Sequence, residues 1–226
     1  MTAERLVKLP PLESGDRLTR DEFEQRYAAM PHLKKAELIE GTVYVSSPLR
    51  TERHGEPHGF IMTLLGVYSA ATPGVGFYDN PTVRLDADNE PQPDAVLRFK
   101  TGGQSYISED DYIEGAPELI VEIAASSASY DLHDKLRVYR RNGVQEYMVW
   151  RTYSQQIDYF QLANGEFVIT SPNSTGIIKS PTFPGLWISL PALLAGNLSE
   201  ALQIVQQGLT SPEHQRFVAA LTRSSS

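Results

Sequence analysis

The chain has 226 residues, of which 41% are hydrophobic and 21% are charged, a composition typical of a globular protein with one sizeable core. It contains no cysteine, which excludes disulfides and thiolate metal ligands and leaves carboxylates, histidines, carbonyl groups or water to hold any metal. Such ligands favour Mg²⁺ or Mn²⁺. No stretch approaches the roughly 20 apolar residues of a membrane span, and the first residues lack a secretory layout, so we expect a cytoplasmic protein without membrane contact.

The formal net charge of −8 opposes nonspecific binding to nucleic acid, which comes mainly from lysine and arginine displacing counterions from phosphates. A protein of this charge can bind a phosphate backbone only through local positive charge, or through an oligomer whose groove concentrates it. Net charge does not fix the sign of the potential inside a cleft, so a nucleic-acid substrate stays possible.

The first predicted elements are a helix, a hairpin and a second helix. Residues 19–22 have the spacing of a capping box, and the apolar residues that follow at helical spacing predict a short helix that ends near Pro31. Residues 36–45 predict two short strands with a turn at Glu40-Gly41. Pro57 suits the first turn of a second amphipathic helix.

Four strands are predicted next. Residues 76–78, 82–85 and 95–99 have strand patterns, and residues 101–117 are expected to form a loop. Residues 118–124 are apolar on both faces except at their carboxylates, which is typical of a strand buried within a sheet. We expect this strand to be central.

A helix should follow the central strand, because Leu132, Leu136 and Tyr139 recur at helical spacing before Asn142-Gly143. Its N-cap could be any of four residues: Ser126, Ser127, Ser129 and Asp131.

The next strand covers residues 146–150, so strand, helix and strand form a βαβ unit. Residues 157–160 and 167–169 form a hairpin around Asn164-Gly165, and a last helix starts at Pro212.

Glu122 is the most informative position, because a carboxylate in a buried apolar strand is unfavourable unless a metal, a cation or several donors meet it. Strand alternation places Glu118 and Glu122 on one face, and we expect Glu118 to be solvated near the strand start. Asp94 opens an earlier strand and would meet Glu122 if the two strands are neighbours. Two convergent acids make a divalent-cation site. The alternative is a pair of acids that cap loops or face water.

Several short segments resemble the Uma-type nucleases, a former domain of unknown function within the PD-(D/E)XK superfamily. The resemblance covers roughly residues 19–195 and extends to the opening hairpin at 37–41 and the closing turn at 183–186. The segments that carry it most strongly are Pro93-Asp94, residues 117–123 around Glu122, residues 134–139 around Lys135, and residues 143–147.

This resemblance implies an α/β fold with a restriction-endonuclease-like mixed β-sheet core flanked by helices, with an N-terminal helix and hairpin. It further implies a Mg²⁺-dependent (or Mn²⁺-dependent) nuclease in which Asp94 and Glu122 bind the metal and Lys135 assists the attacking water. The residue types suit this chemistry, because carboxylates hold a hard cation and a nearby ammonium group offsets charge on the phosphate.

One departure concerns the lysine. The superfamily usually has a lysine two residues after the acid, where this chain has Ala124, and the nearby lysine is Lys135 on the next helix. The Uma-type group resembles this chain in that displacement. The alternative for Lys135 is an ordinary surface pair with Asp131, four residues earlier.

Other residues have weaker support. The resemblance marks Glu37, His58 and Tyr139 as possible supporting residues, although the phase of Tyr139 favours core packing. His54 and His58 are four residues apart, but Pro57 argues against a two-histidine zinc site. Three arginines of the same helix could steer a phosphate backbone toward the site, or could form a solvated helix face: Arg137, Arg140 and Arg141.

Taken together, the sequence predicts an N-terminal extension over residues 1–18, a nuclease-like domain over 19–195 and a C-terminal helical extension over 196–226 packed on the same domain. The expected activity is metal-dependent hydrolysis of phosphodiester bonds in nucleic acid, with DNA as the expected polymer. A catalytically inactive binding module and a small-molecule phosphohydrolase are the alternatives. A homodimer is expected by analogy with other nucleases of this fold.

Overall fold

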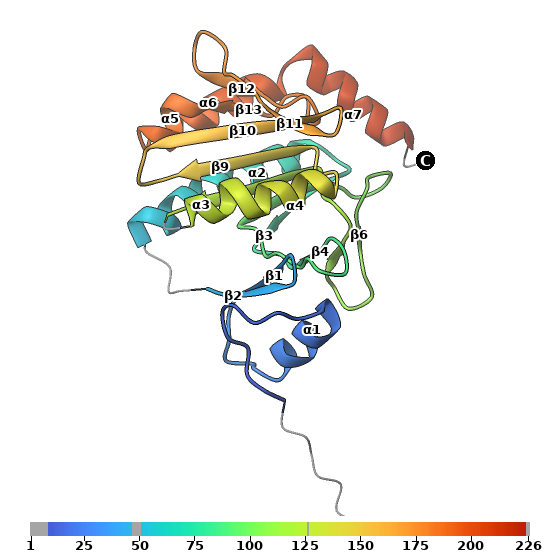
Figure 1. Ribbon diagram of the computed structural model, residues 1–226. Coiled ribbons are helices and arrows are strands. Elements are labelled where there is room, and N and C mark those ends of the chain that lie inside the picture. The colour runs from blue at the N-terminus through green and yellow to red at the C-terminus, as the bar shows by residue number, and fades with distance from the viewer. Residues whose placement is uncertain (1–8, 47–50, 126, 225–226) are drawn as a thin grey trace, which may run out of the picture.

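The computed structural model describes residues 9–46, 51–125 and 127–224. A six-stranded mixed sheet forms its centre, in the order β11-β10-β9-β8-β5-β3 (Figure 1). Only β8 and β9 pair in parallel in this sheet, as a βαβ unit requires, and the other neighbours are antiparallel. The strands are β3 (Val75–Asp79), β5 (Ala95–Phe99), β8 (Leu119–Ala124), β9 (Glu146–Arg151), β10 (Gln156–Ala163) and β11 (Glu166–Ile169).

The central position predicted for residues 118–124 is confirmed, because β8 lies between β5 and β9 and all six of its residues are buried. Its alternation divides the core in two. Leu119, Val121 and Ile123 pack on one face of the sheet, whereas Ile120 and Ala124 pack on the other.

The first face is covered by the long helix α2 (Glu56–Ala71) and by the C-terminal elements. Those elements are β12 (Ile177–Lys179), β13 (Trp187–Ser189), α5 (Leu190–Leu194), α6 (Leu198–Leu209) and α7 (Pro212–Ser224). The last helix starts at Pro212, as predicted. Its residues Phe217 and Leu221 pack against this core, and α6 contributes Ala201 and Val205. No helix within the described ranges is long and apolar enough to cross a membrane.

The opposite face carries the helical segment that joins β8 to β9. It runs through α3 (Ala128–Tyr130), the π-helical turn η2 (Asp131–Lys135) and α4 (Leu136–Arg141). Ser127 is the N-cap residue, so Asp131 lies inside the helix and is not its cap. Ser126 lies outside the described residues.

The N-terminal part forms a third core cluster beneath the sheet, as Figure 1 shows. Thr19 makes the predicted capping box with Glu22 and begins α1 (Arg20–Ala28). The hairpin turns at Glu40-Gly41, as predicted, and consists of β1 (Ala36–Ile39) and β2 (Thr42–Val45).

Two predictions for the connecting segments were wrong. The expected loop over 101–117 contains two short strands, which with β4 (Val83–Arg84) form a separate small sheet: β6 (Tyr106–Ile107) and β7 (Ile113–Glu114). Glu118 is 2% exposed rather than solvated. Its carboxylate accepts hydrogen bonds from the backbone N–H groups of Phe99 (2.9 Å) and Gln104 (3.0 Å), which offset its burial.

Candidate active site

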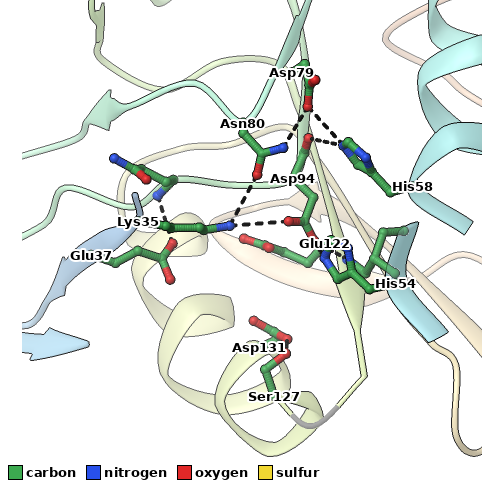
Figure 2. Close-up of polar contacts among 12 residues, drawn as sticks. Lys35, Glu37, His54, His58, Asp79, Asn80, Asp94, Glu122, Ser127 and Asp131 are labelled. Atoms are coloured by element: carbon green, nitrogen blue, oxygen red, sulfur yellow. Dashed lines mark hydrogen bonds and ion pairs between the residues drawn. The ribbon is translucent and has the colours of Figure 1, made fainter. Parts of the chain in front are cut away.

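The sheet brings Asp94 and Glu122 together. Asp94 directly precedes β5, whose first residue, Ala95, pairs with Val121 of β8. The backbone N–H of Ile123 donates a 2.7 Å hydrogen bond to Asp94 Oδ2, so Asp94 meets β8 one residue beyond Glu122. Figure 2 shows the two acidic side chains next to each other. Their strands are neighbours, which is the condition under which the two acids were expected to meet.

Asp94 is 3% exposed and is surrounded by donors. Lys35 Nζ lies 3.2 Å from Oδ1, and His54 Nε2 lies 3.2 Å from Oδ2. Burial alone would raise the pKa of Asp94, but His54, Lys35 and the Ile123 N–H outweigh it and hold the pKa below its ordinary value. Asp94 is therefore an ionised, preorganised carboxylate.

Lys135 lies in the interior, with 2% of its surface exposed. Its Nζ lies 2.8 Å from Glu122 Oε1, 2.8 Å from Glu37 Oε1 and 3.8 Å from Asp131 Oδ1. Burial favours the neutral amine, but these three carboxylates raise the pKa of Lys135 well above its ordinary value. The alternative of an ordinary surface pair with Asp131 was wrong, because the pair exists but is buried.

Glu122 is 3% exposed and accepts a second hydrogen bond at Oε1, from the Tyr139 hydroxyl at 2.9 Å. Tyr139 itself is fully buried in the core, so the packing role expected from its phase and the polar contact coexist. Burial raises the pKa of Glu122 to about 8, with Lys135 opposing the rise and Asp94 adding to it. One ammonium group thus contacts three carboxyl groups, and at neutral pH Glu122 is largely in its protonated form.

Glu37 and His58 take different positions around these acids. Glu37, from β1, accepts the backbone N–H of Gln92 at 2.7 Å in addition to its contact with Lys135. His58 Nε2 contacts the backbone carbonyl of Asp94 (3.1 Å) and the carboxylate of Asp79 (3.0 Å). His58 therefore supports the backbone at Asp94 (Figure 2), and Glu37 adds a carboxylate beside Lys135.

A divalent cation fits the donor chemistry of Asp94 and Glu122. Both are buried carboxyl groups. Burial raises the pKa of Glu122 and the nearby Asp94 adds to the rise, and a bound cation would favour the ionised form instead. The described part of the chain contains no group of three or more histidine, aspartate or glutamate side chains arranged to hold a metal. Mg²⁺ does not require such a cage, since proteins commonly bind it through one or two carboxylates with water and substrate phosphate.

The three arginines of α4 lie away from this pocket and have acidic partners. Arg137 pairs with Asp134 at 2.7 Å, Arg141 pairs with Glu40 at 3.1 Å, and Arg140 pairs with Glu166. About half of each side chain of Arg137 and Arg141 is exposed. Their positive charge is therefore largely matched locally, which weakens a steering role.

Sequence reasoning missed three residues of the site. Lys35 is adjacent to Lys34 and lacks a motif. The sequence indicates His54 only as a partner of His58, and Asp131 only as a helix cap or as a surface partner of Lys135. The one available signal was the alternation of β1, which places Lys35 on the same face as Glu37.

Comparisons with known proteins agree with this description. The family model Uma2, described as "Putative restriction endonuclease", matches residues 20–191. A crystal structure of "a putative nuclease belonging to DUF820 from Anabaena variabilis ATCC 29413" is similar, with a TM-score of 0.62 and 15% identity over 80% of this chain and 99% of that chain. None of the curated proteins compared matches this chain.

The structural likeness shows the fold, and the mixed sheet flanked by helices is the predicted restriction-endonuclease-like core. The predicted Uma-type resemblance is likewise confirmed, over most of the chain. The chain belongs to the Uma2 family.

Proposed function

We propose that this protein is a divalent-metal-dependent endonuclease that hydrolyses phosphodiester bonds in nucleic acid, with DNA as its substrate. The observation that carries the proposal is the convergence of Asp94 and Glu122 from paired strands, with Lys135 Nζ 2.8 Å from Glu122. The description of the family as a restriction endonuclease supports DNA as the polymer.

In this proposal Asp94 and Glu122 hold Mg²⁺ or Mn²⁺. When bound, the cation supplies a polarised phosphate oxygen and a water of lowered pKa. Lys135 fixes the carboxylate of Glu122 and offsets the negative charge of the pocket, and Tyr139 orients Glu122 through the same oxygen. Glu37 and His58 support these side chains from β1 and α2.

A homodimer is part of the proposal, because cutting both strands of a duplex commonly uses two copies of such a site. The edge strand β11 presents Val168 and Ile169 with 53% and 64% of their surfaces exposed. An unpaired edge with exposed apolar side chains is a surface suited to pairing with a second chain.

Incubation of the purified protein with Mn²⁺ and supercoiled DNA, single-stranded DNA and mononucleotides tests the function directly. We expect nicked and linear DNA from the wild type and a loss of at least about 100-fold in rate for Asp94→Ala, since the metal ligand is removed. Asp88→Ala is the matched control, because Asp88 is exposed.

The same assay separates the alternatives. Hydrolysis of nucleotides without polymer cleavage would favour a small-molecule phosphohydrolase. Binding of DNA without any cleavage, at every Mn²⁺ and Mg²⁺ concentration, would favour an inactive binding module. Cleavage that Asp94→Ala leaves unchanged would contradict the proposed site.

A further inference from the structure

Two lysine ammonium groups flank the acids of the site, and they differ in access to solvent. The side chain of Lys135 is 3% exposed and is held by Glu37 and Glu122. The side chain of Lys35 is 19% exposed, and its Nζ lies 3.2 Å from Asp94 Oδ1 and 3.4 Å from Asn80 Oδ1. Lys35 is therefore the more exposed of the two cations and holds one carboxylate, Asp94, so an incoming cation could replace it as the counterion. Moving Lys135 would leave two buried carboxylates without a counterion.

Lys35 lies on the more solvent-exposed side of the site. It immediately precedes β1, and strand alternation turns Lys35 and Glu37 to the same side. Figure 2 shows Lys35 extended between Asn80 and Asp94, with Glu37 beside it. Glu37 reaches inward to Lys135, so Lys35 forms the outer layer of the same cluster.

The two oxygens of Asp94 have different partners. Oδ2 accepts the 2.7 Å hydrogen bond from the Ile123 N–H and lies 3.2 Å from His54 Nε2, and both partners are buried. Oδ1 is held by the partly exposed Lys35 at 3.2 Å. A cation that arrives from solvent therefore meets Asp94 at Oδ1, where it competes with an ammonium group for the same oxygen.

We propose that Lys35 is a displaceable counterion, which leaves Asp94 Oδ1 when a divalent cation binds and then contacts the scissile phosphate. This inference rests on the proposed function and names a catalytic residue that the family resemblance did not indicate. A lysine suits the role, since its ammonium is a compact charge with three donors on a flexible four-carbon stem. After its displacement, the ammonium group of Lys35 stays within one side-chain length of Asp94. From there it could contact the phosphate of a substrate bound to the metal.

The alternative is that Lys35 only fixes Asp94 in place. The two roles predict opposite effects on metal affinity. If Lys35 competes with the metal, its removal strengthens metal binding while it weakens cleavage. If Lys35 only positions Asp94, its removal weakens both.

The experiment combines calorimetric titration of Mn²⁺ into the protein with cleavage of supercoiled DNA at saturating Mn²⁺. Lys35→Met is compared with Lys34→Met, which removes the same charge from an exposed neighbouring residue, and Lys35→Gln provides a second, polar replacement. We expect both Lys35 variants to bind Mn²⁺ roughly tenfold more tightly, since they remove a cation close to the site. We expect their cleavage rates to fall by about 100-fold, a typical loss for one transition-state donor. Lys34→Met should match the wild type in both measurements.

The outcomes are distinguishable. Unchanged or weaker Mn²⁺ binding by the Lys35 variants, in a wild type that binds Mn²⁺ and cleaves DNA, overturns this inference and leaves the proposed function standing. Tighter binding with undiminished cleavage overturns the contact with phosphate. If the wild type does not bind Mn²⁺, or binds it equally well after Asp94→Ala, both the proposed function and this inference are overturned.

Discussion

At the scale of single residues, Lys135 links the stability of the protein to its site. Its ammonium group is the shared partner of Glu37, Glu122 and Asp131, all of them buried. Removing one partner of a buried ion pair leaves uncompensated charge, which is far more unfavourable than loss of an exposed pair.

We therefore expect Lys135→Met to lower the free energy of unfolding by about 3–5 kcal/mol at pH 8, measured by urea denaturation. Lys100→Met, at an exposed position, should change it by less than about 0.5 kcal/mol. A Lys135→Met variant as stable as the wild type would show that the buried ammonium group is not the counterion of these acids.

Glu90 lies outside the candidate site, and its burial should make the stability of the protein depend on pH. It is 3% exposed, and burial together with Glu24 raises its pKa to about 8 in spite of Arg84 nearby. Between its ordinary pKa, about 4.5, and about 8, the folded protein keeps a proton that the unfolded chain has lost. The stability of the folded state therefore falls as the pH rises through this window.

Glu90→Gln is neutral at every pH and should escape that loss. We expect the melting temperature of Glu90→Gln, relative to the wild type, to be higher at pH 9 than at pH 5. A change of roughly 3 °C corresponds to about 1 kcal/mol in a domain of this size. Glu109→Gln, at an exposed position, should show no such trend. A constant difference between Glu90→Gln and wild type across this range would contradict the raised pKa.

The residues of the site differ in how readily the sequence reveals them. Glu122 stood out because an acid in an apolar strand requires a partner. Asp94 stood out because it opens an earlier strand and could meet Glu122, and the role of Lys135 followed from the family resemblance. Lys35 and His54 lie on a strand start and a helical turn whose side-chain directions depend on tertiary packing. The prediction that Glu118 is solvated failed because its burial depends on two backbone N–H donors, Phe99 at the end of β5 and Gln104 in the following segment. No local sequence pattern indicates those contacts.

At the scale of elements, two π-helical turns border the site. The turn η1 (Thr51–Gly55) leads into α2 and carries His54, and η2 carries Asp131 and Lys135. Single π-turns are frequent at functional sites, because the wider turn changes the direction of the side chains it carries. The helical periodicity of the sequence predicted the helices but not these turns, because each turn covers only five residues, too few to show a period of its own.

Glu146 connects the sheet to the C-terminal layer. It begins β9, is fully buried, and accepts hydrogen bonds from the Ser180 hydroxyl (2.7 Å), the Thr182 N–H (2.7 Å) and the Tyr159 hydroxyl. Ser180 and Thr182 lie between β12 and β13, so one carboxylate joins that segment to β9 and β10.

We expect Glu146→Ala to destabilise the fold by about 3 kcal/mol, since it leaves several buried donors without a partner, measured by thermal and urea unfolding. Glu109→Ala serves as the exposed control. A loss below about 1 kcal/mol would show that water or a neighbouring acceptor replaces the carboxylate.

At the scale of the whole molecule, the central strand, the βαβ unit and the hairpin of β10 and β11 were predictable, because each has a strong local signal. The C-terminal layer was predicted only as a helical extension, because its short strands and helices have weak periodicity and depend on packing against α2 and β13. The net charge is −8, and the arginines of α4 are paired with acids. The proposed binding of DNA therefore requires a local positive surface or an assembly of two chains.

We expect the wild type to be a dimer by light scattering and Val168→Lys/Ile169→Lys to be a monomer, because two charges on the β11 edge oppose strand pairing. Tyr106→Lys changes an aromatic residue with 63% exposure on the small sheet and should leave the dimer intact. A monomeric wild type would contradict the proposed homodimer but would not contradict the proposed metal-dependent cleavage.

The most direct test of the account is the anomalous difference map of a crystal soaked in Mn²⁺. We expect a peak in contact with the carboxylates of Asp94 and Glu122, absent from the Asp94→Ala variant. A map without a peak at these two acids, or with Mn²⁺ bound only elsewhere, would contradict the assignment of this pocket as the metal centre of a nuclease.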